Sequence, residues 1–285
     1  MSIRTYNPNV RVGNWNEDVC LQEDLLKDFL DKKDRGELLI HKTHNLMSTI
    51  LRKVELSHYS DGFVHIGDRI CLYNPNSLTV LSANVSPSDA LEAKCIPAPC
   101  QVSSSQRVEP CPRNTFVIRS CDGTEDGQRL CYDQHFFLQT LPDEGGELYL
   151  HSDLATFIKS AKHSRQQEVM LVKDSSFKTA WKVECFDPQD RLESKGCPVM
   201  AGQKLLINHC KTNQNLSALT KFTVRTAYGR ELEMTAHTEL DSHKAESPSN
   251  HWVFVQDSSE VKDGVLTTAN LQEQEQKTRG MPVVV

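Results

Sequence analysis

A short phrase that occurs three times along the chain limits its fold more than any other feature. The phrase joins a glycine, a polar residue and a basic residue to an apolar run, and its copies begin at Gly67, Gly127 and Gly202. A leucine-centred segment follows each copy, and an aromatic residue then opens a strand-like stretch. The leucine-centred segments are Val80–Ala83, Tyr149–Ser152 and Asn215–Ala218, and the aromatic residues are Phe116, Trp181 and Trp252. Three landmarks in one order through three units indicate an internally triplicated domain.

The residues of the phrase favour β-structure. Glycine permits the backbone to leave a turn, and the apolar run has the length of a strand. One such unit cannot bury its apolar face alone, whereas three units that close on each other can, and closure also removes the sheet edges. The alternative is that the phrase marks any turn that enters a strand, but chance rarely keeps three landmarks in order. The sequence therefore predicts a closed, mainly β domain.

The spacing of the landmarks separates unit two from the others. The glycine and the leucine are 14 residues apart in units one and three, and 23 apart in unit two, from Gly127 to Leu150. The excess includes residues 139–146, which contain proline and glycine and so favour a longer hairpin.

The three units occupy residues 60–256, and two other regions flank them. Residues 1–59 predict an extended arm and two amphipathic helices. The first helix has acidic residues in its opening turn and Lys32 and Lys33 before a stop at Gly36, and the second is expected to pack on the β domain. Trp15 either fastens the arm to the domain or inserts into a partner. Residues 257–285 predict a polar tail that is flexible or becomes ordered only on a partner.

The composition argues against several classes of protein. The formal net charge of −6 disfavours broad nucleic-acid binding. The sequence has no run of the roughly 20 apolar residues that cross a bilayer, so we expect no membrane insertion. The N-terminus lacks the apolar core of a signal peptide. We therefore expect the ten cysteines to be reduced thiols.

The cysteines and histidines give little support to metal binding or catalysis. Cys71 and Cys131 take corresponding positions in units one and two, where unit three has Leu206, so they are predicted to pack as small core residues. The sequence has no Cys-x-x-Cys pair for zinc, and His41 and His44 have no third ligand nearby. It also has no nucleotide-binding loop, nucleophile elbow or zinc-protease motif. We expect no catalytic residue, cofactor, metal or small-molecule substrate; an enzyme whose site assembles from distant residues is the alternative.

Two stretches without acidic residues lie in this acidic chain, at residues 154–167 and 195–230. In the strand-like segment Lys221–Arg225, alternation places the two basic side chains on one face and Phe222 and Val224 on the other. The stretches form either an ordinary solvated face or a contact surface for an acidic partner. The candidate contact residues are Trp15, Lys159, Lys162, Arg165, Lys204, Lys211, Lys221, Arg225 and Arg230.

The ends of the units resemble the MIR motif, most clearly at Gly146–Asp153, Trp181–Val183 and Asn250–Phe254. MIR motifs build β-trefoils in protein O-mannosyltransferases and in inositol-trisphosphate and ryanodine receptors. The resemblance implies a β-trefoil of twelve strands, with six in a barrel and six in a cap. A carbohydrate- or ligand-binding trefoil is an alternative function, but the shared aromatic residues occupy core-like positions instead of exposed sugar platforms.

Over its whole length the chain resembles the family of cilia- and flagella-associated protein 161. The opening Val10–Asp18, the helix segment Leu26–Leu30 and the triplicated domain behind them carry this resemblance. It implies a structural microtubule inner protein in the cytoskeleton of the motile cilium, located in the lumen of the axonemal doublet. Such a protein binds tubulin and neighbouring inner proteins and has no catalytic activity. Because tubulin is acidic, docking of this chain requires local basic patches.

Overall fold

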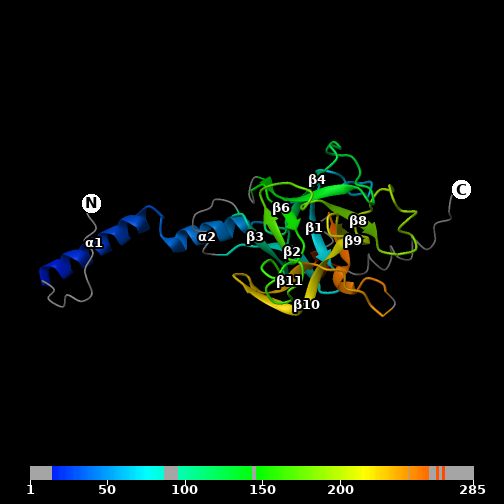
Figure 1. The fold of residues 1–285 in the computed structure, drawn as a ribbon. Coiled ribbons are helices and arrows are strands. Elements are labelled where there is room, and N and C mark those ends of the chain that lie inside the picture. The colour runs from blue at the N-terminus through cyan, green and yellow to red at the C-terminus, as the bar shows by residue number, and fades with distance from the viewer. Residues whose placement is uncertain are drawn as a thin grey trace.

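The computed structural model describes residues 15–86, 96–142, 146–242 and 244–256, and the short segments 261–262 and 265–266. Two helices, α1 (Trp15–Asp34) and α2 (Leu39–Ile50), precede the strands, and the short 3-10 helix η2 (Pro248–Asn250) precedes the last strand of the β domain (Figure 1). The strands of the β domain are β1 (Arg69–Asn74), β2 (Thr79–Asn84), β3 (Cys100–Ser105), β4 (Thr115–Ser120), β5 (His135–Thr140), β6 (Tyr149–Ser152), β7 (Val169–Val172), β8 (Trp181–Cys185), β9 (Lys204–His209), β10 (Gln214–Thr226), β11 (Gly229–Ala236) and β12 (Trp252–Val255). The two-residue strands β13 (Val261–Lys262) and β14 (Val265–Leu266) pair with each other.

Six strands close into a barrel. Each unit of four strands contributes its first and its fourth strand, and neighbours pair antiparallel in the order β1, β4, β5, β8, β9 and β12, with β12 returning to β1. The closing pair aligns Leu72 with Phe254. Closure therefore satisfies both edges of each barrel strand.

The second and third strands of each unit form a hairpin, and the three hairpins pair with one another as a cap. The hairpins are β2–β3, β6–β7 and β10–β11. Strand β3 pairs with both β7 and β11, and a bridge between Glu168 and Thr235 completes the ring of hairpins. A six-stranded barrel with a cap of three hairpins is a β-trefoil. The predicted fold class and its division into six barrel and six cap strands are confirmed.

Three backbone hydrogen bonds on the threefold axis hold the units to one another. The segments just before β1, β5 and β9 meet there, and each donates to the next. The nitrogen of Leu130 donates to the oxygen of Val64, that of Val64 to Val199, and that of Val199 to Leu130, at 2.8 to 2.9 Å. The three side chains are completely buried, so unit contacts and core formation are coupled at this point.

The threefold symmetry corrects the predicted alignment of unit two. Gly67 and Gly202 each lie two residues before the first strand of their unit, with φ of 91° and 74°. The corresponding residue of unit two is Asp133, with φ of 67°, and not Gly127. Aspartate tolerates this left-handed conformation better than most residues. The position therefore did not require glycine, and the glycine phrase shifted the alignment by six residues.

The corrected alignment also changes the prediction for two cysteines. Cys71 corresponds to Phe137 and Leu206 on the first strands of the other units, whereas Cys131 lies before β5 and bridges to Pro198. The predicted equivalence of Cys71 and Cys131 is wrong. The prediction that Cys71 packs as a core residue is confirmed, because its exposed fraction is 1%.

The connection between the first and second strands of unit two, β5 and β6, is longer than its counterparts, as predicted. The excess is smaller than the nine residues that the sequence comparison indicated. From Asp133 to Leu150 there are 17 residues, against 14 from Gly67 to Leu81. In the sequence the excess lies between the end of β5 at Thr140 and the start of β6 at Tyr149.

The aromatic residues that close the units are core residues, as predicted. Phe116, Trp181 and Trp252 are completely buried on β4, β8 and β12. The indole nitrogens of Trp181 and Trp252 donate to the carbonyl oxygens of Leu150 and Leu216, at 2.8 and 3.0 Å. Each of these two closing residues therefore ties its barrel strand to the hairpin of its own unit.

Helix α1 ends as its sequence predicts. Gly36 has φ of 68°, its nitrogen donates to Lys33, and the nitrogen of Glu37 donates to Lys32. This pair of hydrogen bonds is the Schellman arrangement, which satisfies the last carbonyl groups of a helix. The first turn carries Glu17 and Asp18, where the helix dipole favours acids.

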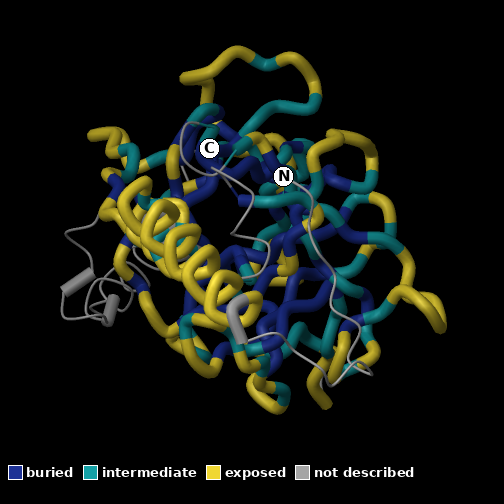
Figure 2. Tube along the Cα trace, turned by 90° about the vertical axis from the view of Figure 1, so that its left-hand side faces the viewer, coloured by how far each residue is buried: buried dark blue, intermediate teal, exposed yellow. Residues whose placement is uncertain are grey.

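The two helices extend to one side of the trefoil, and α1 is exposed along its length (Figures 1 and 2). At the end of α2, Ile50 enters the main core, and Val54 packs with Val117 and Leu141. Among the described residues, neither helix is long and apolar enough to cross a membrane. The extended arm was predicted over residues 1–15, but Trp15 is the first residue of α1. The rest of the predicted arm, the side chain of Trp15 and most of the predicted tail lie outside the described residues.

Candidate partner-binding surface

The connection between β6 and β7, residues 153–168, carries the first predicted basic stretch. Lys159, Lys162 and Arg165 are exposed on it. The same connection exposes large apolar side chains that the sequence did not single out: the exposed fractions are 100% for Phe157 and 90% for Ile158. Isolated exposed apolar residues are common, but two adjacent ones among cations form a distinct feature.

Two carboxylates fix this connection to the rest of the trefoil. Asp153 accepts hydrogen bonds from the Nζ atoms of Lys178 at 2.5 Å and Lys211 at 2.8 Å. These bonds hold the pKa of Asp153 well below its ordinary value. Further along, the buried carboxylate of Glu233 on β11 accepts the backbone nitrogens of His163 and Ser164, each at 2.8 Å.

The hairpin β10–β11 carries the second basic stretch. Exposure alternates along β10, so that Lys221 and Arg225 face solvent while Phe222 and Val224 are half-buried, as predicted. Arg225 lies directly opposite Arg230 across the hairpin. Like charges in this position destabilise a hairpin, so the pair is not explained by folding.

A buried ion pair supports the turn end of this hairpin. Glu231 on β11 pairs with Arg113 at 2.5 Å, and both side chains are at most 3% exposed. Burial alone would raise the pKa of Glu231, but the hydrogen bond and the charge of Arg113 hold it below its ordinary value. The guanidinium also lies over the ring of Tyr228, so the pair fixes the end of the hairpin against unit one.

The two basic stretches form one surface, which we call the basic cap. Glu233 of the hairpin holds the β6–β7 connection, and Lys162 and Val224 line the same small cavity. Lys211 joins this surface through Asp153. The residues of the basic cap are Lys159, Lys162, Arg165, Lys178, Lys211, Lys221, Arg225 and Arg230.

One predicted contact residue lies apart from the basic cap. Lys204 begins β9, at the opposite end of that strand from Lys211, and its Nζ lies 6.0 Å from the ring centre of Phe186. The side chain of Trp15, the remaining predicted residue, lies outside the described part of the chain. Lys178 was not predicted because it stands outside the two acid-free stretches in the sequence.

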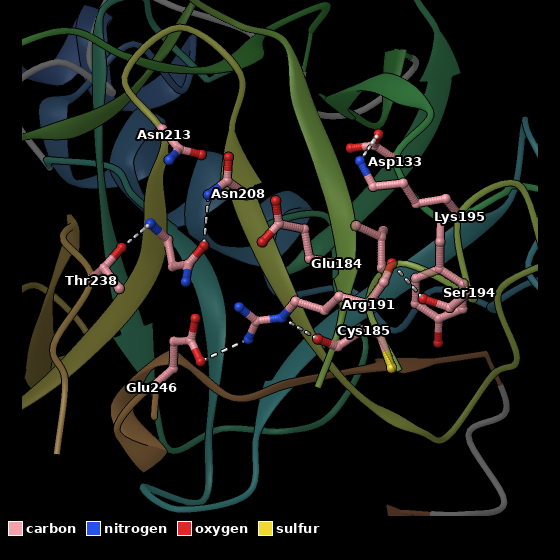
Figure 3. A pocket seen from close by; sticks show the side chains of 13 residues that line it. Asp133, Glu184, Cys185, Arg191, Ser194, Lys195, Asn208, Asn213, Thr238 and Glu246 are labelled. Carbon is pink, nitrogen blue, oxygen red and sulfur yellow. Dashed lines mark hydrogen bonds and ion pairs between the residues drawn. The ribbon is translucent and has the colours of Figure 1, made fainter. Parts of the chain in front are cut away.

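A polar cavity of about 340 Å³ opens beside units two and three (Figure 3). Its charged groups pair with one another: Arg191 with Glu246 at 2.7 Å, and Lys195 with Asp133 at 3.0 Å. Asn208 is 3% exposed, and its Oδ1 atom has no hydrogen-bond partner among the described residues.

The corresponding region of unit one is filled with apolar side chains. Tyr73, Val80 and Val255 pack together there with Cys71 and Val108, all of them buried. In the symmetry of the trefoil, Tyr73 and Val80 correspond to the cavity residues Asn208 and Asn215, and Val255 corresponds to Glu184. A comparison of units one and three in the sequence alone could have found this substitution of polar for apolar residues.

The described residues contain no cluster of three or more His, Cys, Asp or Glu side chains that could hold a metal ion. Nine cysteines are free thiols, and Cys95 lies outside the described residues. Burial raises the pKa of Cys71 to about 12, which suppresses its thiolate form.

Comparison with known proteins identifies the family. The model of the cilia- and flagella-associated protein 161-like domain matches residues 42–257. The chain belongs to the family of cilia- and flagella-associated protein 161. A relative from Danio rerio with that name is 48% identical over 88% of each chain. A relative from Mus musculus with the same name is 39% identical over 93% of each chain. Membership of this family supports a ciliary or flagellar role.

Solved structures of low sequence identity share the fold. A Caenorhabditis elegans protein of unknown function has a TM-score of 0.51 at 16% identity, over 70% of this chain and 99% of that one. The SDF2-like protein from Arabidopsis thaliana has a TM-score of 0.51 at 16% identity, over 68% and 95%. At this identity the likeness supports the trefoil alone.

Proposed function

We propose that the protein is a structural inner protein of the ciliary or flagellar doublet microtubule, without catalytic activity. It binds tubulin and neighbouring inner proteins in the lumen, through the basic cap, and stabilises the axoneme for beating. It needs no cofactor and acts on no nucleic acid, membrane or small-molecule substrate.

The observation that carries this proposal is the basic cap on an acidic chain. The net charge of −6 opposes long-range attraction to acidic tubulin. The trefoil segment, residues 60–256, is itself acidic, with 24 acidic and 20 basic residues. The two acid-free stretches nevertheless gather basic side chains on one part of it, and a locally positive surface is the requirement for docking on an acidic wall.

Charge reversal in the basic cap tests the proposal. Changing Lys221 and Arg225 to Glu should release the protein from salt-washed axonemal doublets into the soluble fraction. Changing Lys27 and Lys32 of α1 to Glu is the matched control and should leave retention unchanged. Retention of the Lys221→Glu/Arg225→Glu variant at the level of the unaltered protein would refute docking through this surface.

A second candidate function, binding of a carbohydrate or another small polar ligand, rests on the cavity in Figure 3. Its unpaired Asn208 Oδ1 and polar lining suit a neutral ligand with hydroxyl groups. The closing aromatic residues offer no exposed platform, since all three are buried. A glycan panel tests this candidate. If no glycan binds, or if Asn208→Ala weakens none of the binding that is seen, the candidate is eliminated.

A further inference from the structure

The tip of the β6–β7 connection is a closed turn with apolar residues at its apex. The nitrogen of Thr156 donates to the oxygen of Lys159 at 2.8 Å, and the nitrogen of Lys159 donates to Oγ1 of Thr156 at 3.0 Å. Phe157 and Ile158 lie between these two residues and point into solvent. Turn apices normally carry glycine, asparagine, aspartate, serine or proline, so turn formation does not explain this pair.

Ion pairs and hydrogen bonds hold the turn from both sides. Before the turn, Asp153 is anchored by Lys178 and Lys211. After it, Ala161 is 3% exposed and its nitrogen donates to Gln166 at 2.8 Å. Glu233 holds the backbone just beyond. A side chain presented on a fixed backbone loses little conformational entropy on binding.

The charges around the apex specify what it contacts. Residues 154–167 contain no acid, and the exposed cations Lys159, Lys162 and Arg165 follow the two apolar side chains on the same connection. An apolar centre with a charged rim is the arrangement of an interface hot spot. We propose that Phe157 and Ile158 anchor the protein in an apolar pocket on an acidic protein surface.

This inference rests on the proposed function, because it takes the acidic surface to be the luminal wall of the doublet. It goes further by assigning the binding energy to two apolar residues, with the cations providing orientation and salt dependence. Loss of the apolar anchor should therefore weaken binding at all salt concentrations, whereas loss of the cations should weaken it mainly at low salt.

Rebinding to stripped doublets tests the anchor. Purified full-length protein is titrated onto doublets isolated from cells that lack it. The variant Phe157→Ser/Ile158→Ser should bind about 30-fold or more weakly, which is the scale of a hot-spot truncation. Leu192→Ser, which also removes a highly exposed apolar side chain, should bind as the unaltered protein does. Since all three positions are exposed, the thermal midpoints should agree closely.

Three results would overturn the inference. If the unaltered protein and the double variant bind doublets equally well, the anchor is wrong while the proposed function stands. If the unaltered protein does not bind doublets at all, both fail. In a parallel arm, the probe is phosphatidylcholine vesicles containing phosphatidylserine. If the unaltered protein binds these vesicles, and the double variant loses vesicle binding but still binds doublets, the apex is a membrane contact.

Discussion

At the scale of single residues, a buried ion pair joins two units of the trefoil. Arg113 and Glu231 are both buried and pair with each other, and the Nε atom of Arg113 also donates to the carbonyl oxygen of Ala83 at 2.6 Å. Removal of one partner from such a pair leaves an uncompensated charge in the protein interior. The pair joins unit one to the β10–β11 hairpin, so its loss affects the support of the basic cap.

We predict that Arg113→Met lowers the free energy of unfolding by about 3 to 5 kcal/mol, because Glu231 is then buried without its partner. Adding Glu231→Met should recover most of this loss. The matched control is Arg107→Met, which breaks the exposed pair of Arg107 and Glu109 and should cost at most about 0.5 kcal/mol. Urea unfolding measures all three. Equal costs for Arg113→Met and Arg107→Met would contradict this account.

His209 gives the stability a dependence on pH. It is completely buried, with Nδ1 2.8 Å from the hydroxyl of Thr212 and Nε2 2.9 Å from the carbonyl oxygen of Lys178. Burial lowers its pKa from the ordinary value of 6.5, although the Lys178 carbonyl opposes this. Below pH 6.5 the unfolded chain therefore takes up a proton before the folded protein does, and stability falls as the pH falls.

We predict that the free energy of unfolding decreases between pH 7.5 and pH 5.5, and decreases less in the variant His209→Asn. The difference cannot exceed about 1.4 kcal/mol per pH unit for one proton. Asparagine suits this position because Asn74 occupies it in unit one and donates to the carbonyl oxygen of Ser249 at 3.0 Å. Denaturant unfolding at both pH values measures the effect, and equal pH dependence in the two proteins would show that His209 is not responsible.

At the scale of elements, the repeats in the sequence predicted the strands correctly wherever buried side chains determine the repeated residues. The leucines and closing aromatic residues are buried equally in all three units, so they marked β2, β6 and β10 and the fourth strands correctly. The glycine landmark failed in unit two because this position requires a backbone conformation, not a particular side chain. Asp133 adopts that conformation without glycine, and a nearby Gly127 took its place in the alignment.

The β10–β11 hairpin yields a prediction at this scale. Arg230→Glu should raise the free energy of unfolding by about 0.2 to 1 kcal/mol, because it turns a cross-strand repulsion with Arg225 into an attraction. The same change should weaken retention on doublets. A gain in stability together with a loss of binding indicates a surface kept for its partner.

The control for this prediction adds a negative charge without relieving the repulsion. Thr220 is exposed in the irregular part of β10 between Leu219 and Thr223, five residues from Arg225. Thr220→Glu should weaken retention but leave stability unchanged or lower. If both variants have the same stability, the opposed arginines do not destabilise the hairpin. Their repulsion then gives no reason to assign this surface to a partner.

At the scale of the whole molecule, the trefoil was predictable and the placement of its functional surface was only partly so. Two acid-free stretches distant in sequence were expected to be basic, and the fold brings them together because Glu233 holds the β6–β7 connection. Lys204 does not join them, since it lies at the other end of its strand from Lys211. Phe157 and Ile158 were missed because two apolar residues in a sequence do not reveal whether they are buried.

We propose that this trefoil binds inside the doublet with its basic cap against tubulin. Electron cryomicroscopy of doublets from cells with and without the protein tests it most directly. We predict a trefoil-shaped density on the luminal wall that disappears without the protein, with the β6–β7 connection and the β10–β11 hairpin facing the protofilaments. Identical luminal density in the two samples, or a trefoil whose basic cap faces away from the wall, would contradict the claim.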